Sequence, residues 1–243
     1  MWIAGGMNNL RASQGRNSAN DYAAQVEQLF EQDYELEKEY HSMLDGKWDH
    51  MMDQTHVMYY YWQEPEMNAM PYVTKVNTKK QARHGPMRII PENTAGAWPG
   101  DNQFNCAAGY GCPDPVLTMD PFLPEGNRFV DVALGGPNGF TFTTTSNVSW
   151  LKISPAKGSL SSSHPEQRVY LSVDWDKVTG IEAALIVFNS SAATQPQEWR
   201  STLPSTYPSP TEAVTVTVIA NHTLVPAGFK GEPLGSSGIA PQT

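Results

Sequence analysis

The feature that most constrains the fold is a change of hydrophobic periodicity part-way along the 243-residue chain. Residues 20–62 place apolar side chains at three- and four-residue steps, whereas residues 125–225 contain short runs that alternate apolar and polar positions. The first period is typical of an amphipathic helix, and the second of a strand with one buried face. The sequence therefore predicts an α+β protein that is helical first and β-rich afterwards.

The helical prediction covers residues 20–62. Its apolar stripe consists of Tyr22, Val26, Leu29, Phe30, Leu36, Tyr40, Met43 and Leu44. Asn20 or Asp21 is expected to cap the start of a first helix, and Gly46 is expected to end it. A second helical piece is expected over residues 48–62. Because two helices cannot bury their apolar faces alone, we expect only part of a helical bundle here.

The β-rich part contains six short segments with many β-branched or aromatic residues, separated by turn clusters. These segments are 128–134, 139–145, 150–153, 168–175, 181–188 and 213–220. Because no helical pattern lies between them, they predict an antiparallel β-sandwich. The predicted organisation is a partial helical-bundle region at 1–70, a loop-rich connection at 71–124, the sandwich at 125–225 and a loose tail at 226–243.

The net negative charge of the chain limits which partners it can bind. The 16 lysines and arginines are outnumbered by 25 acidic residues, which argues against nucleic acid or an anionic membrane surface. Between Asp21 and Asp45, eight acidic residues accompany a single lysine, a pattern typical of a solvated helix face. No window approaches the ~20 consecutive apolar residues that a membrane span needs.

Two cysteines and three glycosylation triplets point to a secretory history. Cys106 and Cys112 flank five residues of a glycine-rich stretch, which is compatible with a small local disulfide. Too few further ligands lie near them for zinc, so we predict no metal site and no cofactor. Asn147, Asn189 and Asn221 each begin an Asn-x-Ser/Thr triplet. Together with a disulfide, these triplets favour an oxidising compartment.

The densest group of reactive side chains lies at residues 46–62. His50, Asp53 and His56 follow one another at three-residue steps, so a metal site formed by them is conceivable on a helix. The alternative is a polar-aromatic seam, with buried hydrogen-bonded histidines and Trp62, that packs against a neighbouring domain. Metal-binding helices usually place two histidines four residues apart, which favours the seam. The sequence contains no phosphate-binding glycine loop and no nucleophile elbow.

These same residues carry a resemblance to glycoside hydrolase family 115, the xylan α-1,2-(4-O-methyl)-glucuronidases. The matching motifs are residues 8–14, 17–20, 46–48, 50–56 and 61–62. They resemble the helical-bundle region that follows the catalytic barrel in that family. Residues 148–160 and 173–175 are similar to the β-domain after the bundle and to Ig-like BACON modules. The resemblance therefore implies a partial helical bundle followed by an antiparallel Ig-like (BACON-like) β-sandwich.

The resemblance also implies what is absent. Family members hold their catalytic carboxylates in a (β/α)8 barrel, and no series of βα units occurs in this sequence. We therefore assign no catalytic residue, and we expect the chain to be inactive alone. Residues 1–6 do not read as a signal peptide. The family implies a secreted parent enzyme, so we expect an extracellular location and a leader outside this chain.

Three functions remain open at the sequence level. The first is a non-catalytic fragment of a family 115 α-glucuronidase acting on glucuronoxylan, with a structural or accessory role for the barrel as its partner. The second is a free-standing module that binds xylan or another plant glycan through Trp98, Trp175 or Trp199. The third is an interaction piece whose helical half docks a separately encoded barrel.

Overall fold

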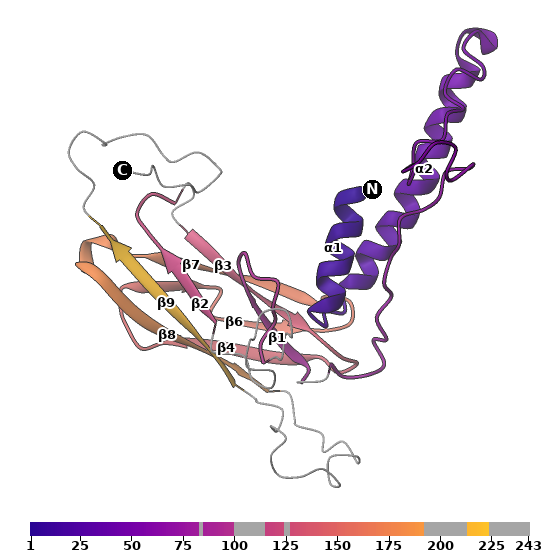
Figure 1. Cartoon of the computed structure of the whole chain (residues 1–243). Helices are drawn as coiled ribbons and strands as arrows, with labels where there is room; N and C mark the ends of the chain where they lie inside the picture. The colour runs from indigo at the N-terminus through magenta and orange to yellow at the C-terminus, as the bar shows by residue number, and fades with distance from the viewer. Residues whose placement is uncertain (83–84, 100–114, 124–126, 192–212, 224–243) are drawn as a thin grey trace, which may run out of the picture. The chain divides into compact units, whose positions relative to one another are not determined.

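The computed structural model describes residues 1–82, 85–99, 115–123, 127–191 and 213–223 (Figure 1). They form two compact units. The helical unit comprises Met1–Ser13 and Asn17–Asn77. The sandwich unit comprises Gln14–Arg16 and the described residues from Thr78 onward. Three of the five residues that separate the two helices in sequence, Gln14–Arg16, therefore belong to the β-rich unit.

Two helices pack against each other in the helical unit, α1 (Trp2–Ser13) and α2 (Ala19–Gly46). The predicted first helix is confirmed as α2. Its last turn leaves helical geometry, because Leu44 and Asp45 have φ values of 51° and 55°, and Gly46 has a φ of 80°. Glycine adopts this left-handed conformation without steric cost, which explains why the helix ends at the predicted residue.

The predicted N-cap of α2, Asn20 or Asp21, is wrong. The helix follows Ser18, which has a helical backbone and makes no side-chain capping hydrogen bond. Asn20 instead lies within the helix, and its side-chain amide pairs with the backbone of Val76. Its Nδ2 donates to the Val76 carbonyl at 3.0 Å, and its Oδ1 accepts from the Val76 N–H at 2.8 Å. Asn20 thus joins α2 to a distant stretch of chain.

The predicted second helix over residues 48–62 is also wrong. Residues 47–77, here called the return segment, contain turns and extended stretches and run back along α2 (Figure 1). His50, Met58 and Gln63 have positive φ values, which interrupt any helix. The Asn68 side chain accepts hydrogen bonds from the backbone N–H groups of His56 and Val57 at 2.8 and 2.9 Å. These bonds offer the backbone an alternative to helical pairing.

The sandwich unit consists of two sheets. The first has the order β1 (Met87–Pro91), β3 (Asn127–Leu134), β7 (Glu166–Val173), β5 (Leu151–Ser154). The second has the order β2 (Val116–Met119), β9 (Ala213–His222), β8 (Gly180–Ser190), β4 (Phe140–Ser146), β6 (Lys157–Leu160). A short 3₁₀ helix, Trp175–Lys177, links β7 to β8.

The strand order is that of an Ig-like sandwich, as predicted. Taken in chain order, β1-β3-β7-β5 corresponds to the A-B-E-D sheet of the immunoglobulin fold, and β9-β8-β4 corresponds to its G-F-C sheet. Every strand pair is antiparallel except β2 with β9, which is parallel. All pairs among the predicted strands are therefore antiparallel, and the parallel pair involves β2, which was not predicted.

The six predicted strands are all present, and β1, β2 and β6 are additional. Two of these, β1 and β2, lie within the interval 71–124 that the sequence described as a loop-rich connection. All five residues of β1 are buried, so it shows no alternation, and β2 has only four residues. Neither strand therefore carries a readable period-2 signal.

The core of the sandwich lies between its sheets and is built from the predicted alternation. On β9, Val214, Val216 and Val218 are buried, whereas the threonines between them are partly exposed. Phe142 of β4 and Phe188 of β8 are among the largest fully buried side chains. Among the described helices, none combines the length and apolar character needed to cross a membrane.

Some predictions fall outside the described residues. They are the disulfide between Cys106 and Cys112, the role of Trp199, and the loose tail at 226–243.

Candidate functional site

The helical unit brings histidines and carboxylates together on one side of α2. Asp33, Glu37 and His41 follow one another at four-residue steps, which places them on the same helical face. The return segment adds Asp53 and His56. His56 Nε2 lies 2.7 Å from Asp33 Oδ2, and His41 Nε2 lies 3.6 Å from Asp53 Oδ1. These five residues are called the histidine–carboxylate cluster below.

Three members of this cluster approach the spacing of a metal site. One ligand atom each from Glu37, His41 and Asp53 lies within 4.8 Å of the other two. A shallow cavity of about 390 Å³ lies alongside, lined by α2 and the return segment, with Asp33, Glu37 and Asp53 among its lining residues. Imidazole and carboxylate groups are both ligands of divalent transition metals, so this arrangement is compatible with a bound cation.

The pKa values of His50 and His56, both on the return segment, are raised above their usual value. The pKa of His56 is raised because the Gln54 carbonyl accepts from Nδ1 at 2.9 Å and Asp33 accepts from Nε2. The pKa of His50 is raised mainly by its 2.6 Å hydrogen bond to Asp53, with a further contribution from Asp49. Both imidazoles therefore act as donors to neighbouring acids, and the bond from His56 to Asp33 ties the return segment to α2.

Of the residues predicted from sequence, Asp53 and His56 belong to this cluster and His50 lies beside it, but not in the predicted form. His50, Asp53 and His56 lie on a turn-rich segment and not on a helix. The two histidines are hydrogen-bonded, but they are not buried, since their side chains are 78% and 44% exposed. Trp62 is 76% exposed. Within this chain, the predicted seam of buried histidines is therefore absent from the described residues.

Sequence reasoning missed Glu37 and His41. Their four-residue spacing on an acidic helix is a weak signal by itself, because acidic helix faces are usually just solvated. They meet Asp53 only because the chain reverses at Leu44–Gly46, where three consecutive residues have positive φ values. A glycine at the end of a helix indicates a stop, but it does not specify the direction of the following chain.

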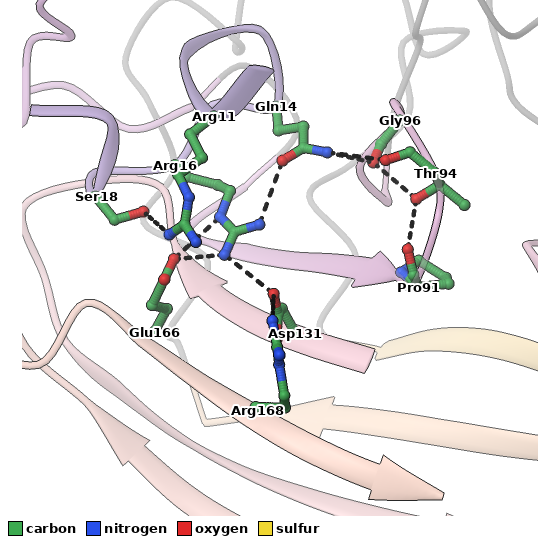
Figure 2. Close-up of polar contacts among 10 residues, drawn as sticks. All are labelled: Arg11, Gln14, Arg16, Ser18, Pro91, Thr94, Gly96, Asp131, Glu166 and Arg168. Atoms are coloured by element: carbon green, nitrogen blue, oxygen red, sulfur yellow. Dashed lines mark hydrogen bonds and ion pairs between the residues drawn. The ribbon is translucent and has the colours of Figure 1, made fainter. Parts of the chain in front are cut away.

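A second polar group lies in the sandwich unit and centres on Arg16 (Figure 2). Arg16 Nη2 contacts Glu166 Oε2 at 2.5 Å and Asp131 Oδ2 at 3.3 Å. Arg168 Nε donates to the other oxygen of Asp131 at 2.8 Å. The side chains of Arg16 and Asp131 are only 4% and 9% exposed. We call these four residues the arginine clamp.

The arginine clamp holds the Gln14–Arg16 turn within the sandwich unit. Gln14 Nε2 donates to the Thr94 carbonyl at 3.2 Å (Figure 2), and the Gln14 carbonyl accepts from Arg88 Nε at 3.1 Å. Between them, Gly15 has a φ of 68°. A Cβ atom at Gly135 would lie 2.8 Å from the Gly15 carbonyl oxygen, so glycine is required for this close approach.

The chemistry of the arginine clamp is structural. Both oxygens of Asp131 accept from guanidinium groups, and Asp131 in turn raises the pKa of Arg168. Charge-assisted hydrogen bonds of this kind hold neighbouring segments in place. The carboxylates of the clamp thus position the chain.

The predicted glycosylation triplets are accessible. Asn147 and Asn189 are exposed, and Asn221 is half-buried. Asn147 uses its Oδ1 to accept the Leu185 N–H at 2.8 Å, which leaves its amide nitrogen available. The attachment atom of this triplet is therefore accessible at the surface.

Two of the three tryptophans considered for sugar stacking lie in the described residues, and neither is a fully exposed ring. Trp98 and Trp175 are partly buried and pack against the hydrophobic core. Trp150 is buried within that core. Beside Trp175, Asp174 accepts from Lys177 at 2.8 Å across the 3₁₀ turn, which favours a turn role for this acid over the lining of a groove.

The comparisons with known proteins return fold-level likenesses. No protein-family model matches the sequence. No curated protein matches it either. The Caenorhabditis elegans protein SSP-19, an MSP-domain family member, is 17% identical over 44% of this chain and 94% of its own, with a TM-score of 0.30.

Two further solved structures are similar in the same way. The seventh PapD-like domain of human CEP192 is 11% identical over 65% of this chain and 99% of its own, with a TM-score of 0.35. A Bacteroides ovatus GH5 xyloglucanase solved with a heptasaccharide is 16% identical over 46% of this chain and 18% of its own, with a TM-score of 0.27. The sandwich is identified as Ig-like from the order of its strands.

Proposed function

We propose that this chain is the helical and sandwich portion of a family 115 α-glucuronidase acting on glucuronoxylan, with a non-catalytic, structural role beside the catalytic barrel. The proposal starts from the motif resemblance at residues 8–14, 17–20, 46–48, 50–56 and 61–62. It is supported by what these motif residues do in the fold.

The first motif supplies the polar contacts that organise both units. Asn8 is fully buried, and its amide donates to the Ala19 and Thr74 carbonyls at 2.8 and 2.9 Å. Gln14 anchors the turn in the sandwich unit. Buried amides with several long-range partners fix a fold, because each would be costly to leave unsatisfied. The residues of this motif therefore stabilise the fold.

The observation that carries the proposal is an exposed, mostly aromatic stretch that includes the last motif. The residues concerned, called the aromatic segment, are Tyr60, Tyr61, Trp62, Met67 and Tyr72, and each is between 70% and 85% exposed. Large exposed apolar side chains gathered on one segment usually mark a protein interface, and Tyr and Trp contribute most to such interfaces. In our proposal, the partner that covers the aromatic segment is the catalytic barrel.

The non-catalytic role is supported by the state of the buried acids. Glycoside hydrolysis needs two facing carboxyl groups, one of which must be protonated. Asp131 and Glu166 both form ion pairs with Arg16, an arrangement that suits a structural role. The accessible triplets at Asn147 and Asn189 are compatible with a secreted, extracellular parent, which is also part of the proposal.

The activity test uses the purified chain on glucuronoxylan. We expect no release of 4-O-methylglucuronic acid. Release that scales with protein concentration and survives re-purification would overturn the non-catalytic role.

The partner test measures binding of the chain to a family 115 catalytic barrel from which the post-barrel region has been removed. We expect a saturable complex that weakens at least tenfold with Trp62→Ala. Tyr170→Ala is the matched control, since Tyr170 is 46% exposed but lies on β7 of the sandwich. Absence of binding, or equal losses for both variants, would contradict a barrel-docking role for the aromatic segment.

The coding sequence upstream of Met1 then decides whether the barrel is encoded in the same frame or separately.

The glycan-binding alternative has weaker structural support. Of its three tryptophans, Trp98 and Trp175 pack against the core, and Trp199 lies outside the described residues. We therefore expect no retardation of the chain in affinity electrophoresis on xylan.

A further inference from the structure

We propose that Glu37, His41 and Asp53 form a binding site for a divalent transition-metal ion, best matched by Zn²⁺, that fastens the return segment to α2. The three side chains come from two elements, and their ligand atoms lie within 4.8 Å of one another. This inference concerns the helical unit alone and does not depend on the proposed partner enzyme.

The orientation of His41 is the first reason. Its Nε2 accepts a hydrogen bond from the Met52 backbone N–H at 3.1 Å, so this nitrogen presents a lone pair and carries no proton. Asp53 Oδ1 lies 3.6 Å from the same nitrogen. These two atoms therefore lie close enough together to ligate one shared cation.

The spacing of these two atoms suits a metal ion. With metal–ligand bonds of about 2.1 Å, a 3.6 Å separation corresponds to a ligand–metal–ligand angle of about 118°, close to tetrahedral. Glu37 lies one turn before His41 on the same helical face and provides the third ligand. The Met52 N–H would give up its bond to Nε2 when the metal binds, and Met52 is exposed enough for water to replace that bond.

Neighbouring side chains orient the ligands. His50 Nδ1 donates to Asp53 Oδ2 at 2.6 Å, which leaves Oδ1 directed towards His41. Asp49 Oδ1 lies 3.9 Å from the other ring nitrogen of His41. A carboxylate behind the metal-binding histidine is a common outer contact in zinc sites, because it fixes the ring and makes the ligating nitrogen more basic.

Charge and ligand type select the ion. The face of α2 has a large excess of acids over its single lysine, Lys38, and so it attracts cations. The imidazole favours zinc or a similar transition metal over Ca²⁺ and Mg²⁺, which prefer sites made only of oxygen ligands. Asp53 is half exposed, so water can complete the coordination.

In the test, the full chain is first treated with a chelator, and Zn²⁺ is then titrated into it in a calorimeter to measure the binding affinity. Thermal unfolding of the helices is followed by far-ultraviolet circular dichroism with and without Zn²⁺. We expect one zinc-dependent site that raises the midpoint of helix unfolding. We also expect His41→Gln and Asp53→Asn each to weaken binding at least tenfold. His164→Gln is the matched control, because His164 is exposed on a turn of the sandwich and should leave the affinity unchanged.

A second measurement guards against a variant that simply fails to fold. On wild-type chain, zinc should shift the imidazole nitrogen resonances of His41 and leave those of His164 in place. Absence of saturable binding would overturn the proposal. So would binding that His41→Gln and Asp53→Asn leave unchanged, or zinc-induced shifts confined to other histidines.

Discussion

The two units of this protein bury very different amounts of apolar material. The sandwich encloses Phe142, Phe188, Leu171 and many other large side chains. In the described part of the helical unit, the buried apolar residues are all small: Ala4, Ala19, Ala23, Val26 and Val57. Fully burying a valine contributes about 1.5–3 kcal/mol, whereas fixing the backbone of one residue costs about 1–2 kcal/mol. The helical unit must therefore draw its stability from elsewhere.

Polar contacts take the place of a core in the helical unit. Asn8 and Asn20 pair with the backbone of the return segment, and His56 pairs with Asp33 on α2. Beyond Val26 no described residue of α2 is buried. The difference teaches that the sandwich has a large apolar core of its own, whereas the helical unit is held together mainly by hydrogen bonds.

The largest expected effect is in the sandwich core. Phe188→Ala should destabilise the sandwich by about 3–5 kcal/mol, because it leaves a cavity between the sheets. Urea unfolding followed by tryptophan fluorescence measures this loss. Leu185→Ala on the same strand is the control, since Leu185 is 44% exposed and should cost little. Equal losses for the two variants would contradict the assignment of the core.

A somewhat smaller effect is expected at the arginine clamp. Asp131→Asn should cost about 3 kcal/mol, because it leaves Arg16 with only one acidic partner in a buried site. The same urea experiment applies, with the exposed Asp176→Asn as its control. A loss below that of Asp176→Asn would show that the clamp does not hold the Gln14–Arg16 turn.

In the helical unit, Asn8→Ala should lower the free energy of unfolding by about 1–3 kcal/mol. The backbone N–H and carbonyl of Thr74 and the carbonyl of Ala19 would each lose their hydrogen bond to the Asn8 side chain. The helical signal in circular dichroism should melt earlier, while sandwich fluorescence should change little. Asn9→Ala, exposed on the same helix, is the control. Coincident loss of both signals would mean that the two units unfold together.

The smallest effect is a pH dependence of the return segment. His56 has a folded pKa above its usual 6.5, so its pairing with Asp33 stabilises fully below pH 6.5 and is lost as the pH rises through the folded pKa. Because His56 is partly exposed, solvent screens much of this effect. Helix melting at pH 6 and pH 8.5 should differ in the wild type, and the difference should shrink in His56→Gln. An unchanged difference would place the titrating group elsewhere.

The same contrast governs what could be predicted from sequence. The alternating residues of β7 and β9 and the apolar stripe of α2 report local periodicity, and the corresponding elements were predicted correctly. Helix α1 was missed because Gly5, Gly6 and two asparagines lower its helix propensity. The error at residues 48–62 arose because three-residue steps of His and Asp imitate a helical period.

The candidate sites were harder to predict than the elements. Arg16 meets Asp131 across 115 residues of sequence, and no local pattern encodes that meeting. Asp53 was identified as a site candidate, but its neighbours Glu37 and His41 were not, because the reversal after α2 depends on three consecutive backbone conformations. Local sequence patterns predict helices and strands, whereas the sites depend on loop conformations that bring distant residues together.

The most direct test of the contrast between the units is amide hydrogen exchange on the full chain without added metal or partner. We predict strong protection for the strands β8 and β9 and much faster exchange for α2 beyond Val26 and for the return segment. Comparable protection in both units would contradict the account, because it would show that the helical unit is stable without a large apolar core.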